Sequence, residues 1–96
     1  MIEIRQSDEF KDWLSNLRDS RARARIAERI RRLGLGNLGD ARPVGDGVSE
    51  LKIDYGPGYR VYFVKPGLEI VVLLCGGDKS SQTRDIRAAK FLAQEV

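Results

Sequence analysis

The amino-acid sequence predicts an α+β domain, in which an N-terminal strand and a helical hairpin pack on a mainly antiparallel sheet and a C-terminal helix follows. Apolar residues recur at helical spacing in the first third of the chain, and they alternate with polar residues between residues 50 and 64. Helices and strands that are segregated along the chain in this way are typical of an α+β fold. The 96 residues suffice for one small domain, residues 1–96, with a single hydrophobic core.

The N-terminal part is expected to form a strand and two helices. Ile2 and Ile4 alternate with charged residues, which indicates a short strand with one buried face. Ser7 suits a helix N-cap, and four apolar residues follow it at helical spacing: Phe10, Trp13, Leu14 and Leu17. A second helix is predicted to follow Asp19 and to end at Gly34, with an apolar stripe of Ile26, Ile30 and Leu33. The two helices should cover one face of the sheet.

The second half of the chain is expected to form strands and a last helix. Residues 34–47 contain five glycines and one proline and are interpreted as a loop. Alternating segments at 50–54 and 59–64, and an apolar run at 68–75, predict three meandering strands. Two turn sequences join them, Tyr55-Gly56-Pro57-Gly58 and Lys65-Pro66-Gly67. A helix is predicted to start near Ser80, so the second sheet face is partly open, or covered by this helix or a partner.

The composition excludes several classes of chemistry. Histidine is absent and Cys75 is the single cysteine, so there is no histidine-based acid–base pair, no Ser-His-Asp triad and no internal disulfide. No metal and no cofactor are expected. The sequence has no apolar run of about 18 residues, and no signal peptide precedes the first predicted strand. A cytoplasmic protein that does not enter a membrane is therefore expected.

The net charge of +3 is unevenly distributed. Residues 18–32 contain seven arginines and only two acidic residues. Such a basic stripe suits a polyanion or an acidic protein partner. The alternative is a helix face that is simply solvated.

Strand alternation places several polar side chains on one surface. If Tyr59 and its alternate neighbours pack under the helices, Arg60 and Tyr62 point to the opposite face of the sheet. Lys52 points the same way from the preceding strand, and Lys79 lies just beyond the end of the apolar strand. These four side chains are expected to converge on one concave surface.

Two segments carry a family resemblance in addition to the order of the elements. One is Glu50 to Asp54 followed by Gly58-Tyr59-Arg60-Val61-Tyr62-Phe63, and the other is Leu73 to Gln82 continued by Asp85-Ile86. On these features the chain resembles, over nearly its whole length, toxins of the RelE/ParE superfamily in the branch of HigB-like addiction-module killer proteins. The resemblance implies a toxin that is neutralised by a cognate antitoxin. Many members cleave messenger RNA on the ribosome, whereas the ParE branch shares the fold and acts on DNA gyrase.

Metal-free RNA cleavage assigns roles to the basic residues. The 2′-hydroxyl attacks the phosphorus, and the reaction needs a base, an acid and positive charge near the phosphoryl oxygens. Arg60, in the Gly-Tyr-Arg context of the family, suits phosphate stabilisation. Lys52 or Lys79 could be the base if neighbouring cations lower its pKa, and the other could be the acid or a second phosphate clamp. Family members tend to carry a reactive tyrosine near the C-terminus, and residues 80–96 contain none.

Further residues are candidates for RNA binding. Tyr59 or Tyr62 could stack on a base, and Gln82 could contact the substrate. On the basic helix, the candidates for ribosomal RNA contact are Arg25, Arg29 and Arg32. Structural alternatives remain for each of these positions, since Arg60 could be solvated or in a salt bridge, Lys52 could pair with Glu50 or Asp54, and Gln82 could be surface. The alternatives for the whole chain are a non-enzymatic gyrase poison and a nucleic-acid-binding module without toxicity.

Overall fold

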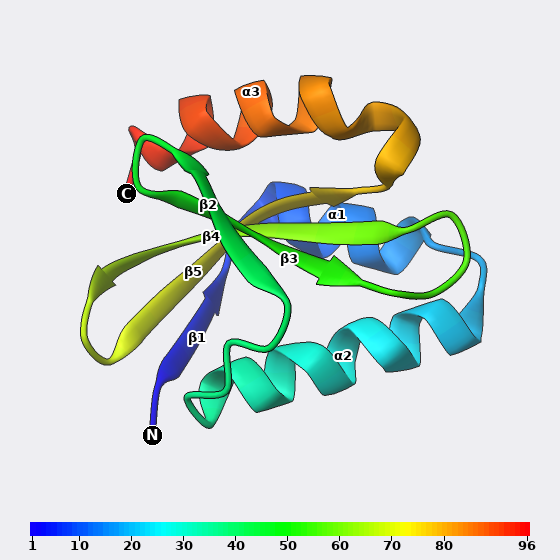
Figure 1. The fold of residues 1–96 in the computed structure, drawn as a ribbon, viewed down its shortest axis with the longest axis horizontal. Coiled ribbons are helices and arrows are strands. Elements are labelled where there is room, and N and C mark those ends of the chain that lie inside the picture. The colour runs from blue at the N-terminus through cyan, green and yellow to red at the C-terminus, as the bar shows by residue number, and fades with distance from the viewer.

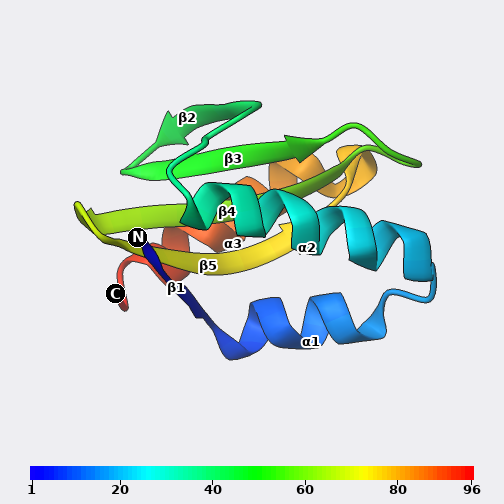
Figure 2. The same ribbon diagram turned by 90° about the horizontal axis from the view of Figure 1, so that it is seen from below.

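The structure, a computed structural model, describes residues 1–96 and consists of three layers (Figure 1). Figure 1 looks onto one edge of a five-stranded sheet, with α3 above the sheet and α2 below it. Figure 2 shows α1 and α2 together on the same side of the sheet, with α3 behind. The elements are β1 (Glu3–Gln6), α1 (Asp8–Asn16), α2 (Ser20–Gly34), β2 (Ala41–Gly45), β3 (Val48–Ile53), β4 (Tyr59–Gly67), β5 (Ile70–Gly77), a 3₁₀ turn (Lys79–Ser81) and α3 (Gln82–Ala93).

The sheet has the strand order β1-β5-β4-β3-β2. β1 pairs with β5 in parallel, and the other three pairings are antiparallel. The predicted α+β class and mainly antiparallel sheet are therefore confirmed. β5 lies between β1 and β4, as expected for an apolar strand that is covered on both faces.

The helical hairpin covers one face of the sheet, as predicted. The Ser7 side chain caps α1 by accepting a hydrogen bond from the Phe10 amide, and Asp19 caps α2. The core between hairpin and sheet contains nine buried apolar residues: Phe10, Ile26, Leu33, Leu51, Ile53, Val61, Phe63, Val71 and Leu73. No helix is long and apolar enough to cross a bilayer, and the longest, α2, has 15 residues.

α3 covers the opposite face of the sheet. A second core lies beneath it and contains five buried residues: Val48, Tyr62, Val64, Leu74 and Ala89. Asp78 caps the turn that precedes α3, because its side chain accepts a hydrogen bond from the Ser80 amide. Of the coverings considered for this face, the C-terminal helix is therefore the one found.

The interpretation of residues 34–47 as a loop was wrong in part, because residues 41–45 form β2. β2 is an edge strand, where a proline such as Pro43 is tolerated, and its register with β3 shifts between Pro43 and Gly45. Asp46 and Gly47 turn the chain into β3, and both have positive φ. The glycines and proline therefore mark a hairpin rather than a structureless segment.

The predicted turn at residues 65–67 was also wrong. β4 continues to Gly67, and the chain reverses through Leu68 and Glu69. Leu68 was expected in an apolar strand, but it is 91% exposed. A register shift between Val64 and Gly67 lets β4 extend beyond the position that its sequence pattern indicates.

The end of β5 allows helices to approach the sheet closely from both sides. A Cβ atom on Gly76 would overlap the ring of Trp13 from α1, and one on Gly77 would overlap the Asp85 carboxylate from α3. Two successive glycines are therefore required where side chains from the two helical layers reach the same strand.

Candidate functional site

A hollow of about 240 Å³ lies on the α3-facing side of the strands β2, β3 and β4. It is lined by Asp40, Arg42, Glu50, Lys52 and Arg60. Strand register explains this gathering, because Arg42 pairs with Glu50 and Lys52 pairs with Arg60. Side chains opposite one another on antiparallel strands point to the same face.

Glu50 is at the centre of a buried polar network. It is 2% exposed. Its Oε2 atom accepts hydrogen bonds from the Tyr62 hydroxyl at 3.0 Å and from Gln82 Nε2 at 2.9 Å. Its Oε1 atom lies 3.1 Å from Arg42 Nε and 3.6 Å from Arg60 Nε. Every side of the carboxylate is thus met by a donor or a cation.

These partners keep Glu50 ionised. Burial alone would raise the pKa of Glu50, but hydrogen bonds from Gln82, Tyr62 and Arg42 outweigh it and hold the pKa below its ordinary value. A buried negative charge therefore lies beneath the cationic groups of the hollow at neutral pH.

Arg60 is held rigidly at the edge of the hollow. Its Nη1 donates a 2.6 Å hydrogen bond to the Gly58 carbonyl, and its side chain is 8% exposed. Its Nε atom has no hydrogen-bond partner, since the 3.6 Å separation from Glu50 is an ion pair and too long for a hydrogen bond. Arg60 is therefore a nearly buried guanidinium with an incompletely satisfied donor.

Lys52 and Lys79 lie on different sides of Arg60. Lys52 is in the same hollow, on the neighbouring strand. Lys79 lines a separate hollow at the start of α3, and a Cβ on Gly58 would lie 3.1 Å from Arg60 Nη1 and 3.6 Å from Lys79 Cβ. The structure therefore brings Lys52 and Arg60 into one hollow and leaves Lys79 next to it, across Gly58.

The two tyrosines are placed differently from the prediction. Tyr62 faces away from the hairpin as expected, but α3 buries it completely, so it has no free ring face for a base. Burial raises the pKa of Tyr62 and keeps its hydroxyl protonated, as a donor to Glu50. Tyr59 lies on the hairpin face, with its ring edge-on to Trp13 at 6.2 Å. The stacking role does not fit Tyr62 in this structure, and Tyr59 lies outside the hollow.

Gln82 is neither simple surface nor a residue of the hollow. Its amide bonds to Glu50, which ties the first turn of α3 to β3. Cys75 is half-buried, and burial raises its pKa to about 12, so its thiol stays protonated at neutral pH. Its Sγ lies 3.8 Å from the Asp85 carbonyl of α3, and Cys75 is not among the residues that line the hollow.

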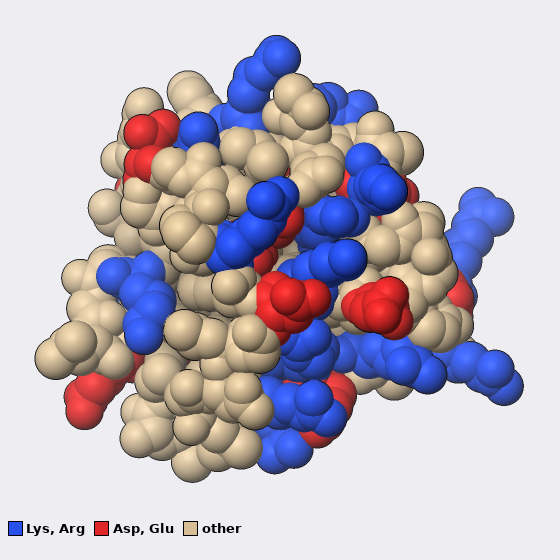
Figure 3. All heavy atoms as spheres, in the orientation of Figure 1, with Lys and Arg blue, Asp and Glu red and all other residues tan.

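The predicted RNA contacts of α2 form a second basic surface. Arg25, Arg29 and Arg32 line a hollow of about 230 Å³ together with Glu28, Ile53 and Asp54. The Arg25 guanidinium lies 4.7 Å from the centre of the Tyr55 ring, and Arg29 Nη1 donates to the Lys52 carbonyl at 3.1 Å. In Figure 3, lysine and arginine atoms form a band from the sheet region down over α2, interrupted by acidic groups. The two basic surfaces meet at the end of β3.

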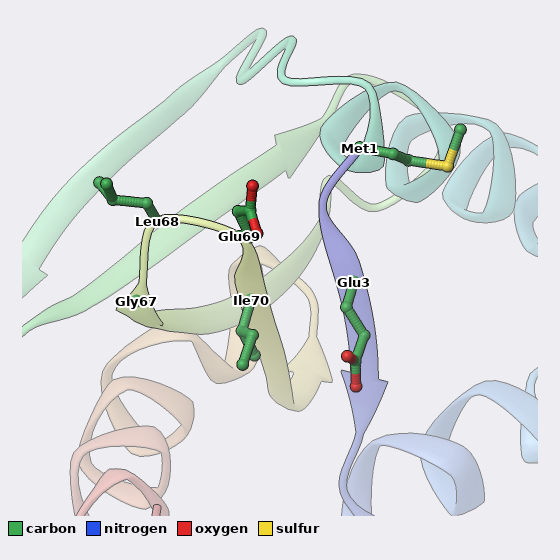
Figure 4. A pocket seen from close by; sticks show the side chains of 6 residues that line it. All are labelled: Met1, Glu3, Gly67, Leu68, Glu69 and Ile70. Atoms are coloured by element: carbon green, nitrogen blue, oxygen red, sulfur yellow. The ribbon is translucent and has the colours of Figure 1, made fainter.

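The largest hollow, about 570 Å³, has a different character. It lies at the opposite edge of the sheet, between β1 and the β4–β5 turn, and is lined by Met1, Glu3, Gly67, Leu68, Glu69 and Ile70 (Figure 4). It contains two carboxylates and no lysine or arginine, and the Met1 and Leu68 side chains point away from each other. This lining does not suit an anionic ligand.

Two residues of the candidate site were missed from the sequence. Arg42 fell in the segment interpreted as a loop, and Glu50 was considered only as an ion-pair partner of Lys52. The Gly45-Asp46-Gly47 sequence, which directly precedes an alternating segment, is a hairpin signal that pairs residue 42 with residue 50. No local signal indicates that Gln82 reaches Glu50, because the contact joins residues 32 positions apart.

The chain is similar to a protein of Haemophilus influenzae whose description is "uncharacterized protein". The two are 53% identical over 95 residues, which cover 99% of this chain and 96% of the relative. No model of a known protein family and no solved structure matches the chain.

Proposed function

This chain belongs to the same family as the Haemophilus influenzae protein, and we propose that it is the toxin of a toxin–antitoxin module and cleaves messenger RNA on the ribosome without a metal. The observation that carries the proposal is the fixed Arg60 guanidinium at the edge of a small hollow with other cations. The proposal also draws on the resemblance of the Gly-Tyr-Arg strand and the Gly-Gly-Asp-Lys-Ser segment to RelE/ParE toxins.

Arg60 supports a phosphoryl-transfer role because it is both charged and immobile. Guanidinium groups present parallel donors to phosphate oxygens, and a group that is already oriented loses little entropy when the transition state forms. In our proposal Arg60 stabilises the negative charge that develops on the phosphoryl oxygens after attack by the 2′-hydroxyl.

Lysines supply the proton transfers in this proposal. Lys52 shares the hollow with Arg60, and Lys79 lies on the other side of Gly58. One of them accepts the proton of the 2′-hydroxyl and the other donates to the leaving 5′-oxygen, and their roles remain interchangeable. Arg25, Arg29 and Arg32 contact ribosomal RNA, and the cognate antitoxin blocks these surfaces in the cytoplasm.

Induced expression tests the function. We expect an immediate block in translation with cleaved transcripts, and we expect Arg60→Ala to remove both. Arg5→Ala is the control, because Arg5 is an exposed strand arginine that pairs with Glu3 on the far edge of the sheet. An amide correlation spectrum of each purified variant checks that it is folded. Full toxicity of folded Arg60→Ala, filamentation with a DNA damage response, or normal growth of the wild type would each contradict the proposal, and filamentation would point to gyrase.

A further inference from the structure

Arg42 reaches the candidate hollow from a strand that was not expected. It lies on the edge strand β2, opposite Glu50, and its Nε donates to Glu50 Oε1 at 3.1 Å. Its side chain is 65% exposed, whereas the carboxylate that it meets is 2% exposed. Arg42 thus has one donor committed to a buried anion and the rest of its guanidinium at the surface of the hollow.

The same carboxylate oxygen orients a second arginine. Glu50 Oε1 also forms an ion pair with Arg60 Nε, at 3.6 Å. Arg42 and Arg60 belong to β2 and β4, the strands on either side of β3, and both line the hollow. Glu50 Oε1 thus faces the Nε atom of each guanidinium, and Arg60 is held in addition by the hydrogen bond from its Nη1 to the Gly58 carbonyl.

We propose that Arg42 and Arg60 form a two-arginine clamp for one phosphodiester group of single-stranded RNA, and that Glu50 is the positioning residue that sets both guanidinium groups. The identity of the ligand as RNA rests on the proposed function, whereas the clamp rests on the geometry. Two neighbouring guanidinium groups repel each other, and the shared buried carboxylate offsets this repulsion. A phosphodiester between them receives charge-assisted hydrogen bonds from both sides.

The charges of the hollow are consistent with an anionic ligand. The hollow is lined by three cationic side chains, Arg42, Lys52 and Arg60, and by two carboxylates. One carboxylate, Glu50, pairs with the two arginines, and the other, Asp40, is exposed. A volume of about 240 Å³ admits one phosphodiester rather than a stacked base pair. The competing explanation is that Arg42 merely covers the Glu50 carboxylate, and the following experiment separates the two.

The binding experiment uses the purified full chain and a short single-stranded 2′-O-methyl RNA, which lacks the hydroxyl needed for cleavage. We expect Arg42→Ala to weaken binding by about tenfold or more, the effect of losing a charge-assisted hydrogen bond. The slope of log affinity against log salt should also fall by about 0.7, as for one phosphate contact on a single strand. Arg5→Ala is the matched control, since Arg5 is an arginine of the other edge strand, 59% exposed and paired with a glutamate.

Arg42→Lys tests the fork geometry at an exposed position of the edge strand and keeps a cation beside Glu50. It keeps the charge but cannot bond Glu50 and the phosphate together, so it should weaken binding by several-fold while changing the salt slope little. Binding by Arg42→Ala that equals the wild type, or that falls no further than in Arg5→Ala, overturns the clamp. If the folded wild-type protein does not bind the RNA, the clamp is overturned as well.

A spectroscopic measurement tests the positioning role of Glu50. In the nitrogen-labelled protein, RNA should shift the Nε–H signals of Arg42 and Arg60 together, and Glu50→Gln should abolish this joint shift. Tyr62→Phe is the matched variant, because it removes a donor to the other oxygen of Glu50 and leaves both arginine contacts. Loss of the joint shift in Tyr62→Phe, or its persistence in Glu50→Gln, contradicts the positioning role. If Glu50→Gln does not fold, the Tyr62→Phe result still tests the positioning role of Glu50, and the Arg42→Lys result still tests the clamp.

The two proposals fail in distinguishable ways. Wild-type protein that binds the RNA through both arginines but leaves transcripts intact in cells contradicts the proposed cleavage and retains the clamp. Transcript cleavage by a chain whose RNA binding is unaffected by Arg42→Ala contradicts the clamp and retains the proposed function.

Discussion

The two faces of the sheet are built by the same strands but differ in what they bury. The hairpin face encloses a core of nine buried apolar residues beneath α1 and α2. The α3 face encloses a smaller core of five residues that includes Tyr62, and beside it lie the buried Glu50 and Arg60. The hairpin face therefore supplies most of the apolar burial, and the α3 face carries the ionisable groups.

This difference shows how a small domain separates stability from chemistry. A buried carboxylate is costly unless donors and cations surround it, so the α3 face depends on a complete network. The hairpin face has no such requirement. Substitutions on the hairpin face should therefore act mainly through lost packing, and those on the α3 face also through the ionised network. Two pairs of substitutions and two single substitutions test this, in order from the largest expected effect to the smallest.

Leu73 and Leu74 are adjacent on β5 and fully buried on opposite faces. Leu→Ala at either position should reduce the free energy of unfolding by about 2–5 kcal/mol. Leu73→Ala should cost more, because Leu73 belongs to the larger core of nine buried residues, whereas α3 alone can shift toward the space left by Leu74. Denaturant unfolding measures both, and a larger loss for Leu74→Ala would contradict this account.

Gly76 and Gly77 compare the close approach of the two helical layers. Gly76→Ala should destabilise the fold by about 1–3 kcal/mol or more, because the rigid Trp13 ring has to move. Gly77→Ala should cost less, since it displaces only the Asp85 carboxylate and its hydrogen bond from Ser81, whereas a whole indole ring has to move at Gly76. Thermal melts of the two variants give the order, and Trp13 fluorescence should change only for Gly76→Ala.

Glu50 should give the α3 face a pH dependence. The pKa of Glu50 is lowered in the folded chain from an ordinary value of 4.5. Its ionised form therefore stabilises the fold above that value, and the contribution is lost as the pH falls through the lowered pKa. Glu50→Gln should thus flatten part of the acid limb of unfolding free energy against pH, and an unaltered acid limb would show that the network does not stabilise the ionised form.

Arg32 should have the smallest effect on stability. It lies on the hairpin side, half exposed, with an ion pair to Glu28 at 3.5 Å. Arg32→Ala should leave the melting temperature unchanged and reduce only the salt dependence of RNA or ribosome binding. A clear drop in melting temperature would mean that this basic surface is structural instead.

Much of the fold could be predicted because it is encoded locally. The alternation in β4 correctly assigned Val61 to the hairpin core and Arg60 to the other face, and Ser7 and Asp19 were recognisable caps. β2 was not predicted, because glycine and proline suggest a loop, although an edge strand accepts both. The burial of Tyr62 and the meeting of Gln82 with Glu50 depend on where α3 docks, which no local pattern specifies. The sheet face on which Arg60 lies was thus predictable, but the contacts that α3 makes when it packs on that face were not.

The parallel pairing of β1 with β5 has a consequence for the order in which the chain matures. The Ser7 hydroxyl, next to β1, bonds the Leu74 carbonyl across 67 positions of sequence. During synthesis the first strand and both hairpin helices emerge long before the strand on which they pack, and contacts of such separation form slowly. The hollow forms later still, since the hydrogen bond from Gln82 of α3 is needed to complete the Glu50 network. A nascent chain therefore holds no finished hollow until α3 has emerged and Gln82 has reached Glu50.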